Sequence, residues 1–486
     1  MLRCRYTVGT ACAAALLFAS PQLASAQPAK PVSFINDVAP ILKENCFACH
    51  DTKKKSGKYD MTSYEKIRAG GANGDPVAPG KPDMSEFHTL IVTADQRRMP
   101  PRDKGEAVPK DKAGIIAQWI KDGAKLDAGL DAKADLVKEL RVRWKPPVPP
   151  AKYPFAIIVN AVGFTPDNKQ LVVGGHHELT VWDIATAKLV KRVYTRAERA
   201  YGIAFLPDGK LVVAGGRPGQ EGDVRVYNIA TKGKDEGGVE ILDGVNDKAV
   251  LVKHLFDVED AVLCLAITAD GKTLAAGGCD RAVRVFDLSA GLDKAALTQT
   301  VENHADWVLG CGLSADGKYL VTAGRDKTAK VWDLKEKQSI VTFPEHQNIV
   351  YGVAVKADGS AGFSVGADRQ LRTWKPNGEG KQVRNAAGHG DEVFKIAYNP
   401  KQPMLATSSA DKTVRLWNAD TLAAGKTLSG LTDYVYTVAF SPDGELVAGG
   451  SYDGSVAVWK VSDGSTVKAF NASPGIVTKE PEPKKK

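Results

Sequence analysis

Apolar and polar residues alternate along the last two thirds of the chain in a pattern that returns at a regular interval. Runs such as YTVAF (436–440) and LVTAG (320–324) carry the apolar positions, and an Asp-Gly or similar turn separates each run from the next. Runs of this kind, bounded by turn residues, predict short β-strands joined as hairpins. We therefore expect this part of the chain to be all-β.

The repeat interval is set by four tryptophans. The four lie 42, 43 and 42 residues apart, at Trp332, Trp374, Trp417 and Trp459. Each stands near the end of one of four segments that align with one another, 315–333, 357–375, 400–418 and 442–460. This is the interval of one four-stranded blade of a propeller. Aromatic residues at the same place extend the series upstream through Phe286, Tyr227 and Trp182. The sequence thus predicts seven repeats, and we assign residues 155–475 to a seven-bladed β-propeller.

The part before the repeats has a helical pattern instead. Phe34, Val38, Ile41 and Leu42 fall on one helical face. A second amphipathic helix carries apolar residues at 115, 116, 119 and 120, with an acidic residue at its start and a glycine at its end. We assign residues 30–126 to a small all-α domain. A proline-rich run, WKPPVPPAKYP, lies within residues 127–154 and predicts an extended linker, and residues 476–486 form a charged tail.

Composition and charge exclude some functions. Of the 486 residues, 43% are hydrophobic and 25% charged, which excludes disorder throughout. The net charge is +8, but Arg3, Arg5 and the three lysines 484–486 contribute five of these charges. Because no basic run with interleaved aromatic residues is present, we expect no nucleic-acid partner.

The first 26 residues predict an export signal. Two arginines are followed by the apolar run VGTACAAALLFAS and by Ala24-Ser25-Ala26, a small-residue cleavage site. An uncleaved anchor is the alternative. No other stretch is apolar and long enough to cross a membrane, so we expect no membrane span in the mature chain. The protein is expected to be periplasmic or otherwise exported.

Two cysteines and a histidine carry the chemistry of the helical part. In ENCFACHD, Cys46 and Cys49 stand two residues apart and His50 follows directly. A Cys-x-x-Cys pair alone would fit a redox disulfide or half a zinc site, but no βαβ pattern and no further pair of zinc ligands accompany it. Cys-x-x-Cys-His is the attachment signature of c-type haem. We predict one covalent haem, with thioether bonds at Cys46 and Cys49 and with His50 on the iron.

A second axial ligand is expected downstream. Met99, in QRRMPPRD, is the first candidate, because a thioether is a good iron ligand and two prolines stiffen the segment behind it. His88 is the alternative and would give two histidine ligands. Arg97 and Arg98 could reach the haem propionates or remain solvated.

Three further cysteines lie in the repeats, Cys264, Cys279 and Cys311. Because Cys311 aligns with Leu265, we expect Cys264 and Cys311 to point to opposite faces of their strands, and we expect no disulfide between them.

Two family resemblances follow from these motifs. The motifs FINDVAPILKENCFACHD, KSGKYDMTSYEKIRAGG, GDPVAPGKPDMSEF, RRMPP and QWIKDGA occur in order from Ser33 to Ala124, and this part resembles the planctomycete cytochrome c domain. The resemblance implies a class-I-like cytochrome fold with Cys46 and Cys49 as thioether positions, His50 as proximal ligand and Met99 as distal ligand.

The repeats resemble WD repeats. The resemblance implies that histidine, aspartate, Ser or Thr, and tryptophan form a buried hydrogen-bonded network in a blade. The residues at the histidine position are His304, His346, His389 and, as a substitute, Leu431, and the aspartates are Asp326, Asp368, Asp411 and Asp453. Because the pattern recurs, we expect these pairs to be structural and not catalytic.

Together these features predict an exported single-haem electron-transfer protein with a propeller that docks a redox partner protein. The alternatives are a redox enzyme with its active site on the propeller, and a gas sensor in which Met99 leaves the iron. The docking surface is expected at one rim, where a row of acidic or amide residues recurs, although these residues could instead cap turns: Glu198, Asp260, Asp306, Asn348, Asp391 and Asp433.

Overall fold

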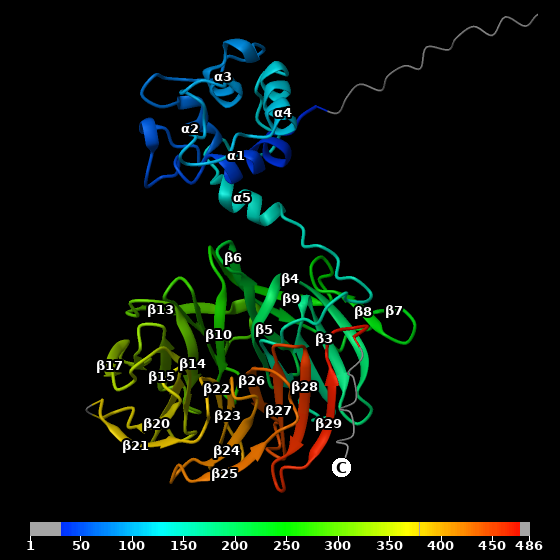
Figure 1. Cartoon of the computed structure of the whole chain (residues 1–486), viewed down its shortest axis with the longest axis vertical. Coiled ribbons are helices and arrows are strands. Elements are labelled where there is room, and N and C mark those ends of the chain that lie inside the picture. The colour runs from blue at the N-terminus through cyan, green and yellow to red at the C-terminus, as the bar shows by residue number, and fades with distance from the viewer. Residues whose placement is uncertain (1–30, 379, 477–486) are drawn as a thin grey trace, which may run out of the picture. The chain divides into compact units, whose positions relative to one another are not determined.

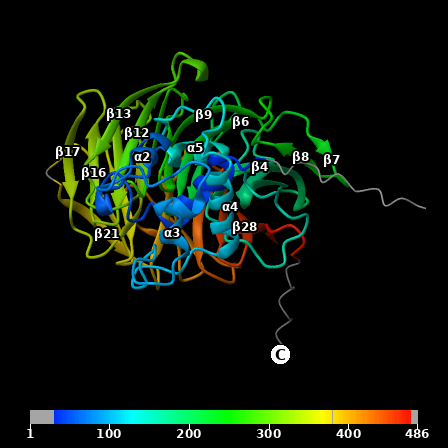
Figure 2. The same cartoon turned by 90° about the horizontal axis from the view of Figure 1, so that it is seen from above.

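The computed structural model describes residues 31–378 and 380–476, which divide into two compact units, one ending at Trp144 and one beginning at Lys145. Figures 1 and 2 show the chain from two sides, and each unit is described here by itself. The predicted export signal and, beyond residue 476, the predicted tail lie outside the described residues.

The first unit is helical, as predicted. Its helices pack around a core in which Phe34, Ile116 and Trp119 are almost fully buried, and the rings of Phe34 and Trp119 lie 5.3 Å apart. The described elements are η1 (Phe34–Val38), α1 (Ala39–Asn45), η2 (Ser56–Lys58), α2 (Tyr64–Ala69), η3 (Pro82–Met84), α3 (Glu86–Val92), α4 (Lys110–Lys121) and α5 (Leu136–Arg143).

Helix α5 lies within the residues assigned to the linker. Asp135 caps it by accepting the backbone N–H groups of Val137 and Lys138, and Leu136 is buried in the core of the first unit. The helix ends at Arg143, shortly before Pro146, which disfavours helical backbone in the residue that precedes it. The helical unit thus extends into the range 127–154.

The second unit consists of sheets, mostly of four strands. The first described sheet has nine strands: β1 (Val162–Phe164), β2 (Gln170–Gly174), β3 (His176–Asp183), β4 (Lys188–Phe205), β5 (Leu211–Arg217), β6 (Glu221–Tyr227), β7 (Lys234–Asp235), β8 (Glu240–Asp243) and β9 (Leu251–Val258). All described strand pairs are antiparallel except that of β4 with β8. The long strand β4 is the last of one group of four, β1–β2–β3–β4, and the first of another, β4–β5–β6–β9.

Five further sheets follow, each with its four strands hydrogen-bonded in chain order. They are β10 (Val262–Ile267), β11 (Thr273–Gly278), β12 (Ala282–Asp287) and β13 (Ala296–Glu302); β14 (Val308–Leu313), β15 (Tyr319–Gly324), β16 (Ala329–Asp333) and β17 (Gln338–Phe343); β18 (Val350–Val355), β19 (Gly362–Gly366), β20 (Gln370–Trp374) and β21 (Gln382–Ala387); β22 (Val393–Tyr398), β23 (Met404–Ser409), β24 (Val414–Asn418) and β25 (Ala424–Leu428); and β26 (Val435–Phe440), β27 (Leu446–Ser451), β28 (Ser455–Lys460) and β29 (Thr466–Asn471).

The sheets pack face to face through their first strands. β10 lies beside β14, β14 beside β18, β18 beside β22, and β22 beside β26. The valines that begin these strands, such as Val308, Val350 and Val435, are fully buried. Apolar residues on both faces of the inner strands are expected when each sheet has a neighbour on either side.

Segments from the first and last repeats also meet. β1 lies beside β26 and β27, and the N–H of Val159 donates to the carbonyl of Ser451 at 3.1 Å. The N–H of Ile157 donates to Oγ of Ser473 at 2.8 Å. A helical part followed by four-stranded antiparallel sheets is therefore confirmed.

Candidate functional site

The two cysteines and the histidine share one helical turn. Where α1 ends, the N–H of Cys46 donates to the carbonyl of Leu42, and the N–H groups of Cys49 and His50 both donate to the carbonyl of Cys46, at 3.1 and 3.0 Å. Both cysteines are thiols and are not joined to each other. The turn therefore places Cys46, Cys49 and His50 at one end of the same cavity.

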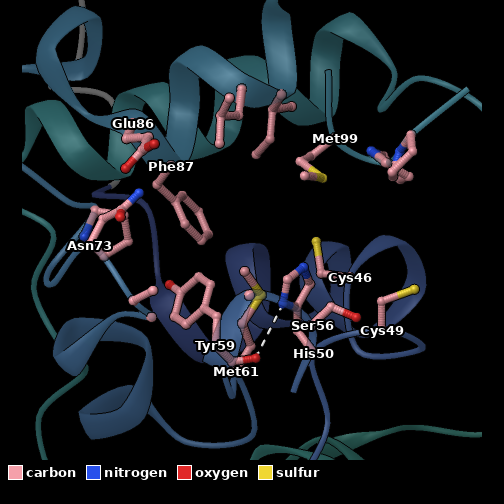
Figure 3. Close-up of a pocket in the computed structure, with 18 of the residues that line it drawn as sticks. Cys46, Cys49, His50, Ser56, Tyr59, Met61, Asn73, Glu86, Phe87 and Met99 are labelled. Carbon is pink, nitrogen blue, oxygen red and sulfur yellow. Dashed lines mark hydrogen bonds between the residues drawn. The ribbon is translucent and has the colours of Figure 1, made fainter. Parts of the chain in front are cut away.

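A largely apolar cavity of about 340 Å³ opens above this turn. Its walls include Cys46, Cys49, His50, Tyr59, Met61, Phe87, Leu90, Ile91 and Met99. Figure 3 shows His50 and Met99 on opposite sides of this space, with the Cys46 sulfur directed into it. The structure thus brings all four predicted site residues to one cavity.

A backbone carbonyl orients the imidazole. Nδ1 of His50 lies 3.2 Å from the carbonyl oxygen of Tyr59. Because a carbonyl only accepts, Nδ1 carries the proton and donates, which leaves the lone pair of Nε2 free to bind a metal. In Figure 3 this second nitrogen faces the Met99 side of the cavity.

The thiol of Cys46 has the properties of a buried apolar group. Burial and the neighbouring Cys49 raise the pKa of Cys46 to about 12. Redox-active Cys-x-x-Cys pairs have a lowered pKa, because the thiolate is their nucleophile. The direction of the shift is therefore opposite to that expected of a disulfide-exchange site.

The segment around Met99 is held by its backbone and by a neighbouring arginine. The N–H of Met99 donates to the carbonyl of Leu90 at 2.8 Å. The guanidinium of Arg98 donates to the carbonyls of Pro100 and Gly105, at 3.1 and 2.8 Å. These bonds fix the chain on both sides of Met99.

The other residues proposed to contact haem, His88, Arg97 and Arg98, do not line this cavity. His88 lines a separate cavity of about 580 Å³ together with Arg98 and Arg102, and its buried Nδ1 has no hydrogen-bond partner among the described residues. Arg97 pairs with Asp95 at 2.8 Å. Neither arginine of the Arg97–Arg98 pair, nor His88, is among the residues that line the cavity of His50.

Sequence reasoning missed the contribution of Tyr59. Its carbonyl orients His50, and its hydroxyl donates to the carbonyl of Ile67 at 3.0 Å. The residue stands in the quoted motif KSGKYDM, but the group that acts on His50 is a backbone carbonyl, which any residue type would supply.

The histidine–aspartate pairs of the repeats form the expected networks. In the sheet β14–β17, Nδ1 of His304 lies 2.9 Å from Asp326, Nε2 lies 2.7 Å from Oγ1 of Thr322, and the indole N–H of Trp332 donates to the same hydroxyl at 3.2 Å. Burial alone would raise the pKa of Asp326, but hydrogen bonds from His304 and Thr328 hold it below its usual value.

The network recurs in the next two sheets. His346 and His389 take the place of His304, with Ser364 and Thr407 as the shared hydroxyls. In the last sheet, where Leu431 replaces the histidine, the indole of Trp459 donates to the carbonyl of Ser429. A network built three times in the same way serves the sheets and is not a single active site.

Five of the six recurring acidic and amide residues accept a nearby backbone N–H, whereas Glu198 pairs with Arg199 at 3.6 Å. Asp306, Asn348, Asp391 and Asp433 each accept the N–H of the next residue, at 2.8 or 2.9 Å. Asp260 accepts the N–H groups of Ala261 and Gly219.

Aromatic rings lie beside this row. The rings of Tyr351 and Phe394 lie 5.4 Å apart, those of Phe394 and Tyr436 4.8 Å, and those of Tyr436 and Tyr452 6.2 Å. Tyr452 is half exposed, as is Tyr434, which follows Asp433.

Two features are absent from the described residues 31–378 and 380–476. No helix there is long and apolar enough to cross a membrane. No group of three or more His, Cys, Asp or Glu side chains there could hold a metal ion.

Comparison with family models assigns both parts of the chain. Residues 46–103 match the model described as Planctomycete cytochrome C. Four stretches, 248–287, 295–333, 380–418 and 424–460, match the model described as WD domain, G-beta repeat.

Curated relatives match a quarter of the chain. Protein groucho of Drosophila melanogaster is 27% identical over 136 residues, 27% of this chain and 16% of its own length. U3 small nucleolar RNA-associated protein 12 of Saccharomyces cerevisiae is 28% identical over 131 residues, 26% of this chain and 12% of its own length. Transcription factor unc-37 of Caenorhabditis elegans is 28% identical over 124 residues, 25% of this chain and 17% of its own length. The chain thus spans less than a fifth of the length of these relatives.

The cytochrome c family implies haem binding, and the four residues at the cavity are of the types that bind haem iron and its vinyl groups. The chain carries a cytochrome c domain of the planctomycete type, fused to a WD-repeat region.

Proposed function

We propose that this protein is an exported electron-transfer cytochrome that binds one haem covalently and docks a redox partner through its WD-repeat region. The observation that carries the proposal is the arrangement of the first cavity, where two thiols, an oriented imidazole and a thioether line one apolar space. Cys46 and Cys49 would hold the porphyrin, and His50 and Met99 would be the axial ligands.

Haem supplies a one-electron ferric/ferrous couple when it is bound. The residues of this chain position it and shield it. The carbonyl of Tyr59 orients His50, the bonds to Leu90 and from Arg98 hold the Met99 segment, and Phe87 and Ile91 exclude water from the cavity wall. If His50 and Met99 both bound the iron, they would leave no open position on it for a substrate, which favours electron transfer over chemistry at the metal.

The covalent bond is tested by denaturation. Full-length protein expressed with a c-type maturation system is expected to keep its haem colour on a denaturing gel and through acidified organic extraction. The variant Cys46→Ser/Cys49→Ser is expected to lose the colour. As a matched control, Cys279→Ser removes a buried thiol of the second unit and should leave the colour unchanged. Colour that is extracted from the wild-type protein would contradict the proposal.

The WD-repeat region supports docking. We propose that its strands form seven four-stranded blades in a closed propeller, with the two groups that share β4 counted as two blades. The contacts of β1 with β26 and β27 support this closure.

The rim with the row of acidic residues is proposed as the docking surface. It combines half-exposed tyrosines with carboxylates, and aromatic residues are enriched in protein interfaces. Asp306 uses one oxygen for its turn, and its other oxygen lies 3.8 Å from Nε of Arg325, an exposed pair whose carboxylate could instead bind a cationic side chain of a partner. The partner would therefore present basic residues.

A further inference from the structure

Two cysteines of neighbouring sheets face each other in the WD-repeat region. Cys264 is the third residue of β10, and Cys311 is the fourth residue of β14. The two side chains point to opposite faces of their strands, as expected, and both are free thiols in this structure. Neighbouring sheets present opposite faces to each other, so such side chains meet in the interface.

The interfaces between the other neighbouring sheets show which positions of their inner strands face each other. The third position of one inner strand faces the fourth position of the next strand, and glycine commonly fills the third. A Cβ added to Gly202 of β4 would lie 2.7 Å from Cβ of Leu265. A Cβ on Gly310 would lie 3.2 Å from the backbone nitrogen of Val353, and a Cβ on Gly352 would lie equally close to that of Ile396.

At the interface of β10 and β14, both positions are cysteine. The buried thiol of Cys264 donates to the carbonyl of Gly277 at 3.4 Å, and that of Cys311 donates to the carbonyl of Ala275 at 3.7 Å. Gly277 and Ala275 lie two residues apart on β11, so both sulfurs are close to one short stretch of backbone. A hydrogen bond with Cys264, together with burial, raises the pKa of Cys311 well above its usual value.

We propose that Cys264 and Cys311 form a disulfide that joins these two sheets when the chain folds in an oxidising compartment. Disulfides need Cβ atoms about 3.5–4.5 Å apart. In the neighbouring interfaces a Cβ at the third position would lie 2.7–3.2 Å from the residue at the fourth position, and here a hydrogen bond joins the two thiols, so the two cysteine side chains are in contact.

The bond forms by thiol–disulfide exchange. Two thiols lose two protons and two electrons, the sulfurs join, and a small-molecule or protein disulfide is reduced to two thiols. The attacking group must be a thiolate. Because the raised pKa suppresses the thiolate in the folded chain, the exchange takes place before the interface is fully packed.

The test maps the thiols in full-length protein exported to an oxidising compartment. The protein is denatured without reductant, alkylated, digested and analysed by mass spectrometry. The expected result is one peptide pair joined through Cys264 and Cys311, lighter than the two free peptides by two hydrogen atoms. Cys279 is the internal control, because it is buried directly after β11, and it is expected to be alkylated. Full alkylation of Cys264 and Cys311 would overturn the proposal.

A stability measurement provides a second readout. The variant Cys264→Gly/Cys311→Val copies the pairing of Gly310 with Val353 and should fold without the bond. In urea titrations, a phosphine reductant is expected to lower the midpoint of the wild-type transition and to leave the variant unchanged. Equal midpoints with and without reductant for the wild type would also contradict the disulfide.

Discussion

At the scale of single residues, His50 and Met99 have unequal support. His50 is oriented by a hydrogen bond to its ring, whereas Met99 is held only through the backbone and through Arg98. Replacing Met99 should therefore change the reduction potential of the haem without affecting its covalent attachment.

Replacing Met99 by histidine tests this role. Met99→His is expected to lower the reduction potential by a substantial part of the ~0.8 V range that axial ligands span, because methionine favours the ferrous state. The absorption band of the sulfur–iron bond should disappear with it. His88→Gln is the matched control and should leave both properties unchanged. If His88→Gln shifts the potential and Met99→His does not, His88 is the ligand.

His177 should make the WD-repeat region less stable in mild acid. Burial and the charge of His176 lower the pKa of His177 to about 4. The unfolded chain has a histidine pKa near 6.5, so it binds a proton that the folded chain does not bind between these values. The contribution of the neutral, buried His177 to the free energy of unfolding is therefore fully present above about pH 6.5 and is lost as the pH falls toward 4.

The matching measurement compares thermal unfolding at about pH 7.5 and about pH 5. His177→Asn keeps a side chain that tolerates the left-handed backbone at this position, where φ is 58°, but it cannot titrate. The difference in Tm between the two pH values should be smaller in the variant than in the wild type. An unchanged difference would show that other groups cause the pH dependence.

The sequence was sufficient to select four residues that share one site. Cys46, Cys49, His50 and Met99 were chosen by motif, and the structure places all four at one cavity, while their roles toward haem stay predictions. The hydrogen-bond partner of His50 is a backbone carbonyl, which every residue type carries, so the sequence does not reveal it. The contact between Cys264 and Cys311 was not foreseen, because strand alternation describes one sheet, whereas their contact depends on how two sheets pack.

At the scale of elements, three of the WD-type sheets each contain one hydroxyl shared by a histidine and a tryptophan. In β23, Oγ1 of Thr407 bonds both Nε2 of His389 and the indole N–H of Trp417. Thr407→Val should leave two buried groups without a partner and destabilise the second unit by roughly 1–3 kcal/mol. Thr342→Val, at an exposed position of β17, is the control and should have little effect. Equal urea midpoints for the two variants would contradict a structural role for the network.

Element prediction was accurate where periodicity was strong and failed at α5. Four tryptophans at a constant interval indicated the later sheets, and the described strands agree with them. Helix α5 has only eight residues and adjoins a proline-rich run, so its pattern was too short to separate it from a linker. Burial of Leu136 against the first unit stabilises it, and tertiary contacts of this kind are not encoded in local periodicity.

At the scale of the whole molecule, the acidic row should control partner binding. A redox partner of this cytochrome should lose affinity for Asp306→Lys/Asp391→Lys and should bind more weakly as salt is raised, because exposed charges are screened over about 8–10 Å. Asp463 is a matched control, because it also caps a turn but lies at the opposite end of its antiparallel sheet from Asp433.

The readout is the rate of electron exchange with the partner. Asp463→Lys should exchange electrons at the wild-type rate, and circular dichroism should show that all variants are folded. If Asp463→Lys slowed electron exchange as much as Asp306→Lys/Asp391→Lys does, overall charge, and not the proposed docking surface, would control the interaction.

The most direct test of the central claim is one optical and mass measurement on the purified full-length protein. The account predicts a polypeptide heavier than its amino-acid sequence by one haem, a reversible one-electron change on reduction, and a sulfur–iron band in the oxidised form. A mass without haem, or haem that binds added carbon monoxide in place of Met99, would contradict an electron-transfer cytochrome with both axial positions filled.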